Sequence, residues 1–314
     1  MDKFYLRRIC AEMNWIRRED SFVKTAVLLI GHGSRDEQGN AEFLRFVEEL
    51  RERMAGQMMV GCFLEFAKPD IAAGIATCVA LGATRIVAVP MILLAASHVK
   101  LEIPEFLDEA RKLYPSLDIV YGCNIGLHER LLDLLVERFQ EADTALASQK
   151  TAMEDTAIVL MGRGSSDPDA NGDVYKIARM LWERTGVSTV ETCFTGITYP
   201  SLQDGVSRAV RLGAKRIFVI PYFLFTGILI KRMKNRMPEL QQEYPQVSLQ
   251  MAKYFGLHDI LYEVVLDRIQ EAQQAKSRMN CDFCQHRQLA QHRHFDHDDL
   301  AYRAQHQTVG EVLA

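Results

Sequence analysis

Three side chains that can bind a metal or move a proton recur at an even spacing in the first third of the chain. His32, Glu65 and His98 are separated by 33 residues each. Two imidazoles and one carboxylate suit a divalent first-row metal, and the same groups accept protons near neutral pH. Each also has an ordinary explanation, as a hydrogen-bonded loop histidine or a glutamate that caps a helix or pairs with a base. Their shared placement favours the chemical interpretation.

The segments around these residues alternate between strand and helix patterns. Apolar runs at 26–30, 58–64, 85–94 and 117–121 are typical of buried parallel strands. Helical spacing of apolar residues follows each run, over 43–54, 70–81, 103–113 and 127–140. The pattern predicts an α/β fold with parallel strands and right-handed crossovers. Because His32, Glu65 and His98 each follow a strand, we expect them at the carboxyl edge of one sheet, where open α/β sheets bind ligands.

The second half of the chain repeats the first at an offset of 131 residues. The segment 25–34, TAVLLIGHGS, matches 156–165, TAIVLMGRGS, and LGATRI at 81–86 matches LGAKRI at 212–217. A fixed offset over this length predicts a tandem duplication. In the second copy, Arg163, Gly196 and Leu229 occupy the positions of the three candidate residues. Framework residues are repeated but these three are not, which predicts one active site per chain, in the first half.

The repeat sets the predicted domain organisation. We expect two duplicated lobes, each a four-stranded parallel sheet flanked by helices, with the active cleft between them. The predicted segments are an N-terminal extension (1–22), a catalytic lobe (23–145), a linker (146–155), a degenerate second lobe (156–275) and a Cys/His-rich tail (276–314).

Composition excludes several classes of function. The chain has 314 residues, with 37 Lys and Arg against 41 Asp and Glu, so its net charge of −4 offers no general attraction to nucleic acid. The longest apolar stretch, 86–96, is too short to span a bilayer. Charges throughout the first 22 residues argue against a secretory signal. These features predict a cytoplasmic protein with no membrane or nucleic-acid partner.

Three motifs carry a resemblance to a known family. GHGSRD at 31–36, FLEF at 63–66 with Pro69, and AASH at 95–98 with Ile103 and Pro104 resemble the sirohydrochlorin chelatases of the long CbiX type, over about residues 24–285. One departure is Ser97 before His98, where that family is expected to carry glycine.

The resemblance implies a function and a site. It implies the two-lobed chelatase fold and insertion of Co²⁺ into sirohydrochlorin without ATP, for cobalamin biosynthesis by the anaerobic route; Fe²⁺ insertion for siroheme is the alternative. His32 and His98 would be the active-site histidines and Glu65 the carboxylate that assists metal binding. Metalation requires a ligand that displaces metal-bound water and a base that takes up pyrrole protons. The sequence leaves open which histidine does which.

A tetrapyrrole that carries many carboxylates needs cations in its cleft. Arg35, Lys68 and Lys100 stand beside the candidate site residues in sequence. A second cluster, Lys231, Arg232, Lys234 and Arg236, follows the third strand of the second copy and would face the same cleft if the lobes oppose each other. The ordinary explanation for that cluster is a solvated helix face. We predict Arg35, Lys68, Lys100, Lys231 and Arg232 as substrate-binding residues.

The tail has a composition of its own. Cys281 and Cys284 form a C-x-x-C pair, and five of the nine histidines follow it. The pair resembles the tail of long CbiX proteins, which implies an iron–sulfur cluster, although two cysteines alone cannot hold one. The histidines are typical of metal capture. A tail without function is the alternative.

Two other classes of function compete with a chelatase. A metal-binding module or metallochaperone would use the His-rich tail, with the α/β body as its carrier. A two-lobed small-ligand receptor would fit the architecture, but the lack of a secretory signal argues against it. We expect a monomer with two pseudo-symmetric lobes, or a dimer formed through the tail.

Overall fold

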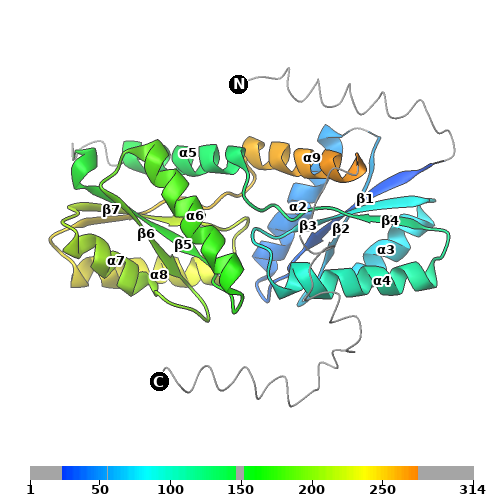
Figure 1. Ribbon diagram of the computed structural model, residues 1–314, viewed down its shortest axis with the longest axis horizontal. Helices are drawn as coiled ribbons and strands as arrows, with labels where there is room; N and C mark the ends of the chain where they lie inside the picture. The colour runs from blue at the N-terminus through cyan, green and yellow to red at the C-terminus, as the bar shows by residue number, and fades with distance from the viewer. Residues whose placement is uncertain (1–22, 55, 146–151, 275–314) are drawn as a thin grey trace, which may run out of the picture. The chain divides into compact units, whose positions relative to one another are not determined.

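The fold consists of two parallel sheets with the same strand order. The computed structural model describes residues 23–54, 56–145 and 152–274. The first sheet contains β1 (Thr25–Gly31), β2 (Met58–Phe63), β3 (Arg85–Met91) and β4 (Asp118–Tyr121), in the order β2-β1-β3-β4. The second contains β5 (Thr156–Gly162), β6 (Thr189–Phe194), β7 (Arg216–Pro221) and β8 (Ser248–Met251), in the order β6-β5-β7-β8. The predicted fold class is confirmed (Figure 1).

The central strands are apolar because helices cover both of their faces. Every residue of β5 is buried, and in β1 all but Thr25 are. Around the first sheet lie α2 (Glu37–Arg53), α3 (Ile71–Ala80), α4 (Ile103–Leu113) and α9 (Asp259–Gln273); around the second lie α5 (Glu129–Ala145), α6 (Pro168–Thr185), α7 (Leu202–Arg211) and α8 (Ile228–Glu243). We call the first sheet with its helices the first lobe and the second sheet with its helices the second lobe.

The last helix of each repeat packs on the sheet of the other repeat. Helix α5 follows β4 in sequence but contacts β7 and α6, whereas α9 follows β8 and contacts β3 and β4 (Figure 1). Arg138 of α5 donates to the carbonyl oxygens of Tyr254 and Phe255, at 2.9 and 2.6 Å. Arg268 of α9 donates likewise to Ile125 O, at 2.8 Å from Nη2. The segments 23–145 and 156–275 therefore exchange their final helices.

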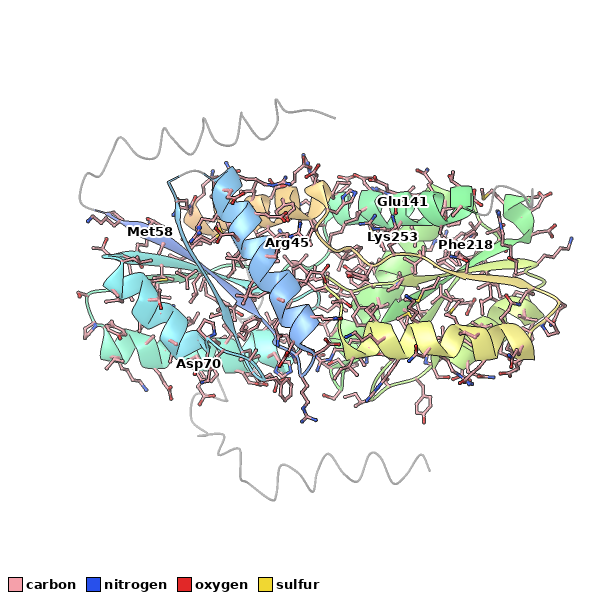
Figure 2. All side chains as sticks on the ribbon, turned by 180° about the vertical axis from the view of Figure 1, so that it is seen from behind. Arg45, Met58, Asp70, Glu141, Phe218 and Lys253 are labelled. Carbon is pink, nitrogen blue, oxygen red and sulfur yellow. The ribbon has the colours of Figure 1, made fainter. Side chains whose placement is uncertain are left out.

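The exchanged helices join the lobes through packing as well as hydrogen bonds. Helices α5 and α9 contact each other across the lobes, and within the second lobe Glu141 of α5 lies 3.4 Å from Lys253, which follows β8 (Figure 2). One apolar cluster contains buried residues of α2 and α9 from the first lobe and of α5 and α6 from the second. The opposite faces of the two sheets have separate cores, under α3 and α4 and under α7 and α8.

Register brings the candidate site residues to one edge. Gly31, the last residue of β1, pairs with Phe63 of β2 and with Met91 of β3. The chain segments that carry His32, Glu65 and His98 therefore leave the sheet at the same level, as parallel strands require.

Several element bounds differ from those predicted. Strand β3 ends at Met91 rather than 94, because residues 92–97 turn away toward His98. Helix α5 continues to Ala145, five residues beyond the prediction, and a 3-10 turn, η2 (Met153–Asp155), occupies the end of the predicted linker. The N-terminal extension, residues 146–151 of the linker and the tail with Cys281 and Cys284 lie outside the described residues. Within the described ranges, no helix is both long and apolar enough to cross a membrane.

Candidate functional site

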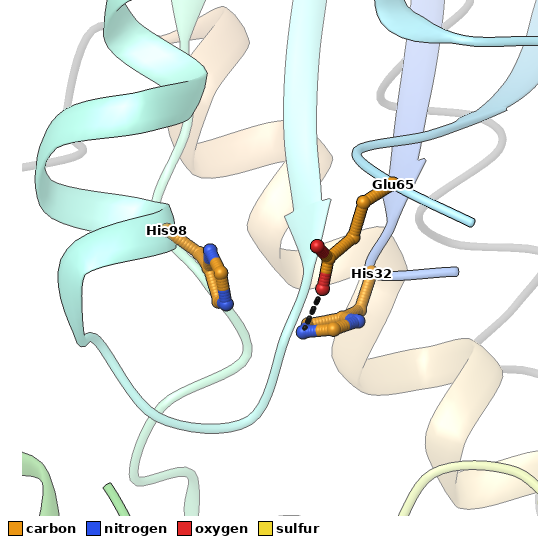
Figure 3. A group of neighbouring side chains, drawn as sticks. All are labelled: His32, Glu65 and His98. Carbon is orange, nitrogen blue, oxygen red and sulfur yellow. Dashed lines mark ion pairs between the residues drawn. The ribbon is translucent and has the colours of Figure 1, made fainter. Parts of the chain in front are cut away.

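His32, Glu65 and His98 converge at the edge of the first sheet. One ligand atom from each lies within 4.8 Å of the others (Figure 3). His32 Nε2 is 3.2 Å from Glu65 Oε1. The two imidazole rings meet edge to face, with their centroids 4.8 Å apart. A divalent ion bonded to all three at about 2.0–2.2 Å requires these side chains to draw closer together. The structure thus brings together the three residues predicted from their spacing.

Backbone hydrogen bonds hold the loops of His32 and Glu65 together. Leu64 N donates to Gly31 O at 2.8 Å, and Glu65 N donates to His32 O at 3.0 Å, so the pairing of β1 with β2 continues past the strand ends. Gly33 has φ +88°, and a Cβ atom there would lie 1.7 Å from Glu65 O. Only glycine permits this approach. The motif Gly31-His32-Gly33 is therefore what sets the imidazole beside the carboxylate.

The hydrogen bonds of His32 define its tautomer. Nδ1 lies 2.9 Å from Gly33 O, and a carbonyl only accepts, so Nδ1 carries the proton. Nε2 lies 2.5 Å from Arg163 Nη1, and a guanidinium only donates, so Nε2 presents its lone pair. Desolvation, helped by the charge of Arg163, lowers the pKa of His32 to about 4. His32 is therefore a neutral imidazole whose Nε2 lone pair accepts from Arg163, with Glu65 Oε1 3.2 Å from the same nitrogen.

Glu65 and His98 complete the ligand set in different surroundings. Burial raises the pKa of Glu65, an effect opposed by the charge of His98. His98 begins a π-helical turn, η1 (His98–Glu102), in which Ile103 N donates to His98 O. Such turns are rare and are often found at functional sites. Within it, His98 Nδ1 lies 2.8 Å from Glu102 Oε1, which leaves Nε2 for the cleft.

His32 and His98 open onto a cavity of about 640 Å³ that both lobes line. His32, His98 and Phe66 contribute from the first lobe, and Arg163, Ile197 and Phe225 from the second. Most of the lining is apolar, with a few polar groups near the trio. This is the usual make-up of a site for a sizeable organic ligand.

The five predicted substrate-binding cations fall into two groups. Arg35 and Arg232 line the cavity. Lys68, Lys100 and Lys231 do not, and each is ion-paired. Lys68 pairs with Asp70, the N-cap of α3. Lys100 Nζ lies 2.7 Å from Asp167 Oδ2, and Lys231 Nζ lies 2.6 Å from Asp36 Oδ2.

Two residues at the site were not predicted to act there. Arg163 was identified only as the second-lobe equivalent of His32, yet its side chain reaches that histidine across the cleft. The repeat could have indicated this contact, because equivalent loops of two lobes that face each other lie close together. Glu102 stands four residues after His98, a spacing that places side chains together on a helix.

These features define a class of protein. It is a two-lobed α/β protein with a histidine–carboxylate cluster in its cleft. The chain belongs to the CbiX family, whose sequence model matches residues 26–142 and again residues 157–272.

The similar proteins are chelatases by name. A sirohydrochlorin cobaltochelatase of Priestia megaterium is 44% identical over 273 residues, which cover 87% of each chain. A sirohydrochlorin ferrochelatase of the same organism is 37% identical and covers 78% of this chain and 89% of its own. The crystal structure of the sirohydrochlorin chelatase SirB from Bacillus subtilis subspecies spizizenii in complex with cobalt has a TM-score of 0.68 at 32% identity, covering 81% of this chain and 97% of that one.

Proposed function

We propose that this protein inserts a divalent metal, Co²⁺ in the first instance, into sirohydrochlorin without ATP. The observation that carries the proposal is the convergence of His32, Glu65 and His98 beside a cavity of about 640 Å³, which both histidines line. The names of the similar proteins support the substrate. The ligand set suits Co²⁺ and Fe²⁺ equally, so the choice of cobalt, and hence of cobalamin biosynthesis, rests on the 44% identical cobaltochelatase. Iron insertion for siroheme is the alternative.

The contacts of the two histidines support different roles for them. His32 is neutral near pH 7 and has its lone pair on Nε2, the nitrogen that lies 3.2 Å from Glu65 Oε1, so we assign it as a metal ligand together with that carboxylate once Arg163 releases the lone pair. His98 has the carboxylate of Glu102 behind it. A carboxylate partner stabilises an imidazolium, so we assign His98 as the base that takes up a pyrrole proton as the metal enters the macrocycle. Arg35 and Arg232 would receive peripheral carboxylates of the substrate.

Metal-dependent change in the absorption spectrum of sirohydrochlorin tests the proposal. We expect turnover with no nucleotide present, and a loss of about 10²-fold or more in His32→Ala and in His98→Ala. His258→Asn is the matched control, because it removes an imidazole outside the site while an asparagine keeps the N-cap of α9. Near-normal turnover by His32→Ala would contradict the assignment. Co²⁺ and Fe²⁺ in competition on one substrate sample decide the metal.

Several further assignments accompany this activity. We infer that the two lobes descend from a tandem duplication, since the family model matches each half. An iron–sulfur cluster at Cys281 and Cys284 stays a prediction, as does metal capture by the tail, and deletion of residues 277–314 tests both. Metal binding without turnover by the purified protein would favour the metallochaperone. We propose a cytoplasmic monomer, and the free thiols of Cys62, Cys78 and Cys193 are compatible with a reducing compartment.

A further inference from the structure

Phe66 is a large apolar side chain held in the open at the edge of the cavity. It follows Glu65 in the loop between β2 and α3, and 52% of its surface is exposed. Phe63, three residues earlier, is 1% exposed in the core. Phe66 lines the cavity together with His32. Its ring is therefore not needed to fill the core of the first lobe.

The backbone at Phe66 adopts a conformation that its side chain disfavours. Its φ of +61° makes it the one non-glycine residue with positive φ in the ranges that the structure describes. A Cβ atom is disfavoured in this left-handed region, and glycine is the residue that adopts it freely. Strain of this kind is retained mainly at functional sites. An aromatic residue at a position suited to glycine indicates that the ring itself is used.

The groups around Phe66 suit a planar, polyanionic ligand. Arg35 Cζ lies 5.0 Å from the centre of the Phe66 ring, so a cation accompanies the aromatic surface. The ring centre lies 6.3 Å from that of His32. A macrocycle packed on Phe66 would thus have its carboxylates near a guanidinium and its centre near the metal ligands.

The second lobe offers an apolar side chain at the equivalent position. Ile197, 131 residues after Phe66, is 76% exposed and lines the same cavity from the loop between β6 and α7. The two loops are related by the repeat, so the cavity has an exposed apolar residue from each lobe.

We propose that Phe66 and Ile197 are substrate-binding residues that pack against the tetrapyrrole macrocycle and position it over His32, Glu65 and His98. The inference rests on the proposed sirohydrochlorin substrate. It assigns apolar packing of the ring system to these two side chains and charge recognition to the arginines. Packing against an aromatic face adds to the free energy of area burial.

Titration of metal-free sirohydrochlorin into the protein, followed by the absorption spectrum of the tetrapyrrole, tests whether Phe66 and Ile197 bind it. We expect Phe66→Ala and Phe66→Gly to raise the Kd about tenfold, and Phe66→Tyr to stay within about threefold of wild type. Ile197→Ala is expected to weaken binding by a smaller factor, because it removes fewer atoms. Leu113→Ala is the control, since Leu113 is 71% exposed and does not line the cavity.

Two further measurements separate this role from a structural one. Phe66→Gly is expected to melt about 2–4 °C above Phe66→Ala, since both lack the ring and only alanine keeps the strain at positive φ. Co²⁺ binding without the tetrapyrrole is expected to be unchanged in both variants. Phe66→Gly would then bind sirohydrochlorin as weakly as Phe66→Ala although it is the more stable of the two variants.

The possible failures are distinguishable. If wild type binds sirohydrochlorin and Phe66→Ala binds it equally well, the role of Phe66 in binding the macrocycle is contradicted and the proposed function stands. If wild type binds no sirohydrochlorin, both are wrong. If the Phe66 variants also lose Co²⁺ binding, the ring supports the metal site instead, which overturns the inference.

Discussion

The side chain of Arg163 and an incoming metal compete for the same lone pair. Arg163 Nη1 donates to His32 Nε2 at 2.5 Å, and that nitrogen is the atom that faces Glu65. The guanidinium also brings a positive charge to the site that we propose for a dication. Metal binding therefore requires Arg163 to withdraw, and the carboxylates of the proposed substrate are suitable new partners for it.

We expect Arg163→Ala to bind Co²⁺ more tightly than wild type when no tetrapyrrole is present. Removing the competing donor and its charge is expected to lower the Kd about tenfold, a free-energy change of about 1.4 kcal/mol. Isothermal titration calorimetry at pH 7.5 measures it. Arg179→Ala is a suitable control, because Arg179 pairs with Glu183 on α6, away from the cavity. Weaker Co²⁺ binding by Arg163→Ala would mean that the arginine supports the metal site rather than competing for it.

For single residues, the sequence predicted which side chains form the candidate site better than it predicted the contacts that they make. His32, Glu65 and His98 could be grouped because each follows a strand of one parallel sheet, and parallel strands end at one edge. Arg163 could not be placed at the site, since its contact with His32 depends on how the two lobes face each other. Lys100 was predicted to bind substrate from its closeness in sequence to the site, and Lys231 from its place after the third strand of the second copy. Neither signal reveals the aspartates that the two lysines meet across the lobes.

The sequence did not show on which sheet helices α5 and α9 pack. Their apolar spacing shows that each buries one face but not against which sheet, and a helix packs equally well on either of two similar sheets. The exchange is visible only in contacts between the two repeats. Tyr262 of α9 stacks on Phe46 of α2, with ring centres 4.3 Å apart, and its hydroxyl donates to Glu49 Oε2 at 2.6 Å. The equivalent pair in the second lobe, Leu132 and Ile177, has no aromatic ring.

Tyr262 is therefore expected to dominate the docking of α9. We expect Tyr262→Ala to lower the free energy of unfolding by about 4 kcal/mol, because a fully buried ring leaves a cavity. Tyr262→Phe is expected to cost about 1–2 kcal/mol, because it loses only the hydrogen bond to a carboxylate. Urea denaturation measures both, with Tyr175→Phe as a control at a half-exposed position. A change below about 1 kcal/mol in Tyr262→Ala would show that α9 does not depend on this ring.

Across the whole molecule, the repeat produces two equivalent ion pairs between the lobes. Lys100 follows β3 and pairs with Asp167, the N-cap of α6, and Lys231 follows β7 and pairs with Asp36, the N-cap of α2. Each partner lies 131 residues from its counterpart. The Lys231 ammonium lowers the pKa of Asp36, and the bonds to Asp167 and Asp169 raise the pKa of Lys100 although burial opposes this. The exchanged helices and the shared apolar cluster also hold the lobes together.

The two ion pairs are expected to restrain the lobes rather than to stabilise the fold. Lys231 is 48% exposed, and pairs of this kind contribute about 1 kcal/mol or less to the free energy of unfolding. In Lys100→Ala/Lys231→Ala we therefore expect a melting temperature within about 4 °C of wild type. Backbone amides of residues 34–37 and 165–167 are expected to exchange with deuterium several times faster, because both loops lose their partner in the other lobe. Lys215→Ala, which breaks a pair with Asp155 inside one lobe, should leave both loops unchanged. Wild-type exchange in the double variant would show that the shared core alone fixes the lobes.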